Sequence, residues 1–150
     1  GLTLDEKEFP AFRERFESVV RETIQQESLD PEMSIDAEIS MADIKPSFYN
    51  ILKQLEPYGP QNLRPVFVSR NLQDTKGFSR IVKEQHLKIV VGGNRQLVSG
   101  IAFNMADKYE LVKNGTRFDV VYTIEENEWN GKTSLQLQVM DIKASGKFVP

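Results

Sequence analysis

The basic residues of this chain are concentrated in one stretch, which makes them the first candidates for a binding function. Residues 64–95 contain seven Lys and Arg against two Asp and Glu, although the whole chain of 150 residues has a formal net charge of −3. Cations gathered in this way attract phosphate groups, and the acidic remainder keeps such binding weak and salt-sensitive. A solvated basic face without a ligand has the same composition, so charge alone leaves both interpretations open.

Aromatic residues lie close to some of these cations in the sequence. Phe78 stands between Lys76 and Arg80, and Trp129 precedes Lys132 in a second segment. Rings stack on bases and cations follow the phosphates, a combination that suits sequence-tolerant binding of single-stranded nucleic acid. The residues that we predict to contact such a strand are Lys76, Arg80, His86, Lys88, Arg95, Asn104, Trp129 and Lys132.

Each of these predictions has a plainer alternative. His86 also fits an ordinary surface histidine, and Phe78 fits a cap on the hydrophobic core. Trp129 could cover one end of the fold, and Asn104 could simply end its strand with a side-chain hydrogen bond to the backbone.

Side chains suited to catalysis are few. His86 is the one histidine and cysteine is absent, so neither a two-histidine nor a thiolate metal site can form. The sequence shows no phosphate-binding glycine loop and no nucleophile elbow. A weak divalent-ion site built from Asp141 and the Glu125, Glu126 and Glu128 cluster is a minor alternative. We therefore predict no catalytic, cofactor-binding or metal-binding residue in this chain.

The composition also bears on location. The lack of cysteine, of a signal-peptide pattern and of an apolar run long enough to span a membrane favours a cytoplasmic protein without a membrane partner.

The first 62 residues are expected to be mainly helical. Phe9, Phe12 and Phe16 recur at helical spacing and predict a helix over about 7–27, whose first turn must contain Pro10. A short strand is predicted over 34–39, and a second amphipathic helix follows with Pro46 in its first turn. Ser40 and Asp43 have capping-box spacing. Residues 57–62 have turn composition and mark a domain boundary.

The remainder of the chain has the alternating pattern of half-buried strands. Strands are predicted near 65–72, 86–92, 97–104, 117–125 and 134–142, with a short helix around 105–113 and a hairpin turn at Gly92-Gly93-Asn94. Five antiparallel strands with a helix between the third and fourth match the order of an OB-fold barrel. We therefore predict an α+β protein in which two N-terminal helices and a short strand precede this barrel. An SH3-like barrel or a simple meander is the competing arrangement.

In an OB-fold the second and third strands and two flanking loops usually carry the ligand face. Strand alternation places Leu87, Ile89 and Val91 in the core and His86 and Lys88 outside. In the third strand, Ile101 and Phe103 are expected to face the core. Gly100, Ala102 and Asn104 would then form an outer face small enough for a nucleic-acid backbone to approach. The flanking loops are predicted at 74–80 and 127–132.

Several short segments, in order, resemble the RecJ family of bacterial single-strand-specific DNA exonucleases. They are Gly1-Leu2-Thr3-Leu4, the junction from Leu55-Glu56-Pro57-Tyr58-Gly59 to Asn62 and Pro65-Val66-Phe67, Arg80-x-Val82 with His86-Leu87-Lys88, Ile101-Ala102-Phe103-Asn104, Asn127-x-Trp129-x-Gly131, and Leu135-Gln136-Leu137-x-Val139-x-Asp141-Ile142. Lys83 stands where the family has glycine, and Leu63-Arg64 where it often has Pro-Glu.

This resemblance implies a function and a domain layout. Residues 1–45 would be the end of a DHH-associated domain, 46–62 a connecting helix and turn, 63–143 the OB-fold domain and 144–150 a tail. The chain would hold single-stranded DNA for a 5′-to-3′ exonuclease of repair and recombination and would be inactive alone. Mn²⁺ or Mg²⁺ would be bound by aspartates and histidines of a catalytic domain that this chain lacks.

The resemblance also implies partners. They would be single-stranded DNA, the catalytic domains of the same enzyme and a single-strand-binding protein. The alternative is a protein-interaction or clamp-closing domain whose face contacts the catalytic domains or a single-strand-binding protein instead of DNA.

Overall fold

The computed structural model describes residues 3–23, 33–93 and 96–146, and the chain divides into two units, Gly1–Met33 and Ser34–Pro150. The first unit contains a short 3-10 helix, η1 (Glu6–Glu8), and the helix α1 (Phe9–Thr23). Pro10 lies in the first turn of α1, where its missing N–H costs no hydrogen bond. The predicted residues 24–27 of this helix fall outside the described part. Phe9, Phe16 and Val19 are exposed.

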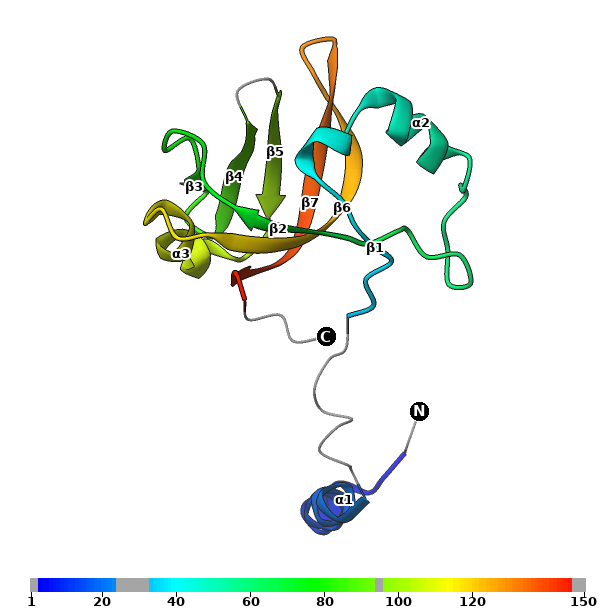
Figure 1. Ribbon diagram of the computed structural model, residues 1–150. Helices are drawn as coiled ribbons and strands as arrows, with labels where there is room; N and C mark the ends of the chain where they lie inside the picture. The colour runs from blue at the N-terminus through cyan, green and yellow to red at the C-terminus, as the bar shows by residue number, and fades with distance from the viewer. Residues whose placement is uncertain (1–2, 24–32, 94–95, 147–150) are drawn as a thin grey trace. The chain divides into compact units, whose positions relative to one another are not determined.

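The second unit is built on one mixed sheet (Figure 1). Its order is β1-β2-β6-β7-β5-β4-β3. The strands are β1 (Ala37–Glu38), β2 (Phe67–Leu72), β3 (Arg80–Val82), β4 (His86–Gly93), β5 (Gln96–Ala102), β6 (Phe118–Trp129) and β7 (Lys132–Ala144). The five strands predicted from the sequence are β2, β4, β5, β6 and β7.

The predicted five-stranded antiparallel barrel is correct only in part. β5 pairs with β7 in parallel, and β1 pairs with β2 in parallel as well. Over the described residues the sheet has seven strands rather than five, and β1 and β3 remain its open edges. The parallel pairs and the edge strands come from long-range pairing, which alternation within one segment does not report.

The segment before β2 also joins this sheet and its core. Ser40 and Asp43 form the predicted capping box at the 3-10 helix η3 (Met41–Asp43), and Met41 and Ile44 are buried. The helix α2 (Pro46–Lys53) begins at Pro46, as predicted. Where the domains of the parent protein begin and end along this chain stays a prediction.

The core lies between the inner faces of the curled sheet, η3 and α2. Leu87, Ile89 and Val91 of β4 are fully buried, as their alternation predicted. Tyr122 of β6 is also buried, and its hydroxyl lies 2.7 Å from Ser69 Oγ. Burial raises the pKa of the Tyr122 phenol to about 12. The hydroxyl pair satisfies the polar atoms that the core would otherwise leave without partners.

The alternation predicted for β5 is wrong by one residue. Val98, Gly100 and Ala102 are buried, whereas Leu97 and Phe103 are each 51% exposed. A Cβ atom at Gly100 would lie 3.0 Å from Ile89 Cγ1 and 3.1 Å from Leu137 Cβ. The interior therefore has room only for small side chains along β5, and the bulky ones face outward.

The predicted short helix between the third and fourth OB strands is present. It consists of the 3-10 helix η4 (Ala106–Lys108) and the helix α3 (Tyr109–Lys113), and Val112 contributes to the core. Within the described ranges, the helices are too short or too polar to cross a membrane.

Candidate nucleic-acid interface

The segment predicted as a loop over 74–80 is held against the edge of β4. Thr75 N donates to Val90 O at 3.0 Å, and Ser79 Oγ accepts a hydrogen bond from Val90 N at 2.9 Å. Arg80 then begins β3, which pairs antiparallel with β4. The true connection to β4 is the turn 83–85, where Lys83 adopts φ 50°. Glycine adopts this left-handed backbone without the strain that a side chain adds, so Lys83 occupies a position that suits glycine.

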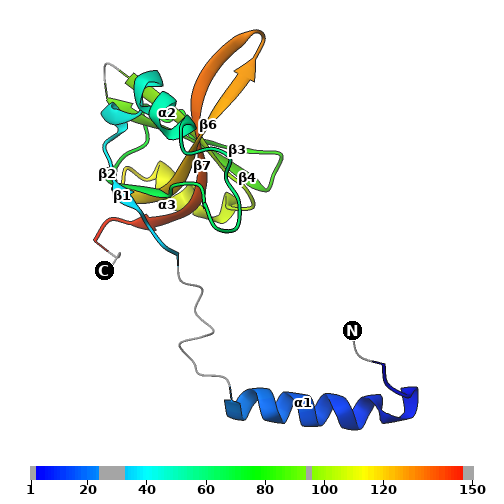
Figure 2. The same ribbon diagram turned by 90° about the vertical axis from the view of Figure 1, so that its right-hand side faces the viewer.

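Side chains from three neighbouring strands share the outer surface here, which we call the β3–β5 face. It consists of Arg80 and Val82 from β3, His86, Lys88 and Val90 from β4, and Ser99, Ile101 and Phe103 at β5. Figure 2 shows β3 and β4 side by side on one side of the sheet.

One row of this face combines charge with apolar surface. Arg80 lies opposite Lys88, and Lys88 lies opposite Ile101. Paired residues of adjacent strands project from the same face, so the two cations and the Ile101 side chain are neighbours. Gln138 of β7 extends the row beyond Ile101.

His86, Phe103 and Asn104 form a second cluster at the end of the same face. The rings of His86 and Phe103 meet edge to face with centroids 5.1 Å apart. Asn104 N donates to His86 Nδ1 at 3.1 Å, which leaves Nε2 as the N–H donor of the neutral ring. Phe103, half exposed, was assigned to the core by the sequence. Alternation gave no signal for its exposure, because Leu97, Ile101 and Phe103 form the more apolar of the two sets of side chains in this segment.

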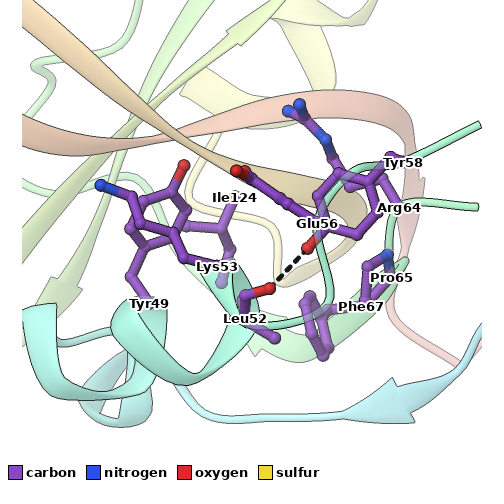
Figure 3. A pocket seen from close by; sticks show the side chains of 9 residues that line it. All are labelled: Tyr49, Leu52, Lys53, Glu56, Tyr58, Arg64, Pro65, Phe67 and Ile124. Atoms are coloured by element: carbon purple, nitrogen blue, oxygen red, sulfur yellow. Dashed lines mark hydrogen bonds between the residues drawn. The ribbon is translucent and has the colours of Figure 1, made fainter.

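The cations of this face differ from Lys53 and Arg64, two basic residues in and near α2, in their partners. Lys53 pairs with Glu126 at 2.5 Å, and Arg64 pairs with Glu125 while lying over the Tyr58 ring. Figure 3 shows Lys53, the last residue of α2, and Arg64, together with the hydrogen bond that the Tyr58 hydroxyl donates to the Leu52 carbonyl at 2.8 Å. The hydrogen bond to Glu126 raises the pKa of Lys53.

By contrast, within the described part of the chain Arg80, Lys88 and Lys76 form no ion pair. A cation without a carboxylate partner keeps its full attraction for an added phosphate. The β3–β5 face is therefore one part of the described surface where positive charge remains available for a ligand.

The remaining predicted contacts are scattered. Lys76 is exposed in a turn with φ 55°, beside β4. Lys132 opens β7, and the predicted loop 127–132 is instead a hairpin in which Asn130 and Gly131 alone connect the strands, both with positive φ. The hairpin extends past the other strands in Figure 1. Arg95 and the side chain of Trp129 lie outside the described residues.

Three of the four carboxylates considered for a metal site, Glu125, Glu126 and Asp141, contact basic side chains. Glu125 contacts Arg64 and, through a reoriented amide, Gln138 at 2.7 Å. Asp141 lies 3.5 Å from Lys143. Among the described residues no group of three or more His, Asp and Glu could hold a metal ion.

Comparison with known sequences gives a consistent family. The model of the RecJ OB domain matches residues 35–141. The single-stranded-DNA-specific exonucleases RecJ of Salmonella typhimurium and Escherichia coli are 34% and 33% identical to this chain over 147 residues. Each match covers 95% of this chain and 24% of the relative, so the chain spans about a quarter of their length.

Solved structures agree with the sequence matches. The crystal structure of RecJ from Thermus thermophilus in complex with Mn²⁺ superposes with a TM-score of 0.73 at 25% identity and covers 100% of this chain and 22% of its own. The complex of the same protein with Mg²⁺ has a TM-score of 0.71 at 26% identity and covers 94% of this chain and 21% of its own.

Proposed function

The chain belongs to the RecJ OB domain family, and from this we propose that its β3–β5 face holds single-stranded DNA for a longer 5′-to-3′ exonuclease. The single observation that carries the proposal is a pair of cations, Arg80 and Lys88, that form no ion pair with any described residue. They lie in register with the apolar Ile101 and next to the exposed Phe103 ring. Cations bind the phosphates, and an exposed ring offers a stacking surface to a base.

Each group has a separate role in this proposal. Arg80 and Lys88 neutralise consecutive phosphates, and His86 donates from Nε2 because Asn104 occupies its other ring nitrogen. Phe103 stacks on a base, with the His86 ring supporting its edge. None of these contacts reads a base edge, so binding should be tolerant of sequence.

In this proposal, other parts of the longer enzyme cleave the DNA. The two related crystal structures were solved with Mg²⁺ and with Mn²⁺, and the described residues of this chain do not offer a matching set of ligands. We propose that catalytic domains outside this chain hold the metal and that this domain, in the cytoplasm, keeps the strand in place during repair and recombination.

The proposal is tested by fluorescence-anisotropy titration of the 150-residue chain with labelled oligo-dT at low and moderate salt. Lys88→Ala should weaken binding about two- to fivefold and lower the salt slope by about 0.7, the value for one phosphate contact on a single strand. Phe103→Ala should cost about 1–3 kcal/mol of binding free energy. Lys45→Ala, an exposed cation before α2, is the matched control and should bind like the wild type.

A second candidate function is docking on another protein, either the catalytic domains or a single-strand-binding protein. Ile51, Leu55 and Leu63 around α2 are 60%, 49% and 75% exposed, and apolar side chains in such numbers suit a protein contact. Absence of DNA binding even at low salt would refute the first proposal and favour this one.

A further inference from the structure

A polar groove lies at the end of β4 opposite to Phe103. Its volume is about 390 Å³, and Gly92 and Gly93 of β4 line one side. The turn after β2, including Thr75 and Lys76, lines another, together with Arg117 from the segment before β6. His86 and Gly92 are six residues apart on β4, which corresponds to about 20 Å at roughly 3.3 Å per residue.

The polar groups of this groove are fixed by the backbone. Arg117 Nη1 donates to Asn71 O at 2.9 Å, which orients the guanidinium. Gln73 Nε2 donates to Gly115 O at 2.9 Å. These side chains therefore lose little additional freedom when a ligand binds.

The charges of the groove suit an anion. Lys76 and Arg117 are its two cations, and neither forms an ion pair among the residues described. Asp74 is the single carboxylate of the described lining, and its Oδ1 already accepts a hydrogen bond from Ser79 N at 2.9 Å. A guanidinium with free N–H groups and a flexible ammonium are the usual partners of a phosphate group.

We propose that this groove is a second phosphate subsite, which takes a phosphodiester of the same DNA strand after it leaves the β3–β5 face. The proposal rests on the function proposed above. Thr75 links the two areas, because its N–H donates to Val90 O on the β3–β5 face while its hydroxyl donates to Gly92 O at 3.3 Å. A strand that follows β4 would thus meet Phe103 at one end and Arg117 at the other.

The test compares the dependence of binding on oligonucleotide length. Labelled oligo-dT of about 6 and about 16 nucleotides, near the limits of OB-fold site sizes, is titrated with the wild type, Arg117→Gln, Lys76→Asn and Lys45→Ala. Asn tolerates the positive φ at position 76. Thermal unfolding of each variant shows whether the loss of the Arg117 hydrogen bond affects folding.

We expect both groove variants to bind the long oligonucleotide about two- to fivefold more weakly than the wild type, with a salt slope smaller by about 0.7. Their binding of the short oligonucleotide should stay unchanged, and Lys45→Ala should resemble the wild type at both lengths. Equal losses at both lengths, or no loss at either, would overturn the subsite. If dTMP alone displaces the long oligonucleotide, the groove holds a free nucleotide and not the strand. If Lys88→Ala also leaves binding unchanged, the proposed function itself is wrong.

Discussion

The substitution Gly100→Ala tests whether Gly100 of β5 faces the core, as in the structure, or faces outward, as alternation in the sequence predicts. In the structure Gly100 faces the core, and a Cβ atom there would meet Ile89 Cγ1 at 3.0 Å and Leu137 Cβ and Val139 Cγ2 at 3.1 Å. If Gly100 faced outward instead, as small residues on a ligand face would, the same methyl group would obstruct DNA and leave the core unchanged.

The expected cost follows from two opposing effects. Inserting a methyl group into a packed core typically costs about 1–3 kcal/mol. Alanine in place of glycine recovers about 0.4–1 kcal/mol, because the unfolded chain loses conformational freedom. The free energy of unfolding should therefore fall by about 1–2 kcal/mol, which for a unit of this size lowers the melting temperature by about 4–8 °C.

Thermal and urea unfolding followed by circular dichroism measure this loss. Gly93→Ala is the matched control for stability, because Gly93 lies on the neighbouring strand with no atom within 4 Å of its would-be Cβ. Below its melting temperature Gly100→Ala should bind oligo-dT like the wild type. A variant that is fully stable yet binds DNA poorly would show that the residue faces the ligand and would refute the reasoning.

Two further predictions concern Tyr122 in the core and the capping box of Ser40 and Asp43 at the start of η3. Tyr122→Phe should cost about 1 kcal/mol in urea unfolding, because it removes the hydroxyl bonded to Ser69. In the wild type, stability should decline as pH rises from about 10 to about 12, since the raised pKa of Tyr122 favours the neutral phenol in the folded state; a decline of equal size in Tyr122→Phe would contradict this. The hydrogen bonds from Ser40 lower the pKa of Asp43, so stability should be lost as pH falls below about 4. Ser40→Ala should melt earlier at neutral pH and show less of this acid dependence; an unchanged acid profile would exclude the capping box as its source.

Local pattern was sufficient for much of the fold. The capping residues Ser40 and Asp43 and the start of α2 at Pro46 were predictable because each depends on bonds within one turn. The core positions of β4 were predictable because Leu87 and Ile89 alternate with polar His86 and Lys88. The extra edge strands and parallel pairs were not, since they depend on partners distant in the sequence.

Hydrophobicity could not predict which side chains of β5 face the core, because the space inside the fold is limited there. Its outward side chains, among them Leu97, Ile101 and Phe103, are larger than the inward Val98, Gly100 and Ala102, so a rule that places the most apolar face inside selects the wrong set. The inner volume available at Gly100 is set by Ile89 and by Leu137 and Val139 of β7. The same error hid Phe103 as a candidate stacking residue.

The sequence also does not show which cations are paired with carboxylates in the fold, and this pairing affects where a ligand can bind. Arg64 and Arg80 belong to one basic stretch and count equally in its net charge. Folding brings Arg64 to Glu125, 61 residues away, whereas Arg80 is placed opposite Lys88, another cation. Two like charges held in register repel each other until an anion lies between them. The sequence therefore predicts that a basic stretch exists, but only strand pairing shows which of its cations are left for phosphate, and Arg80 and Lys88 are such a pair.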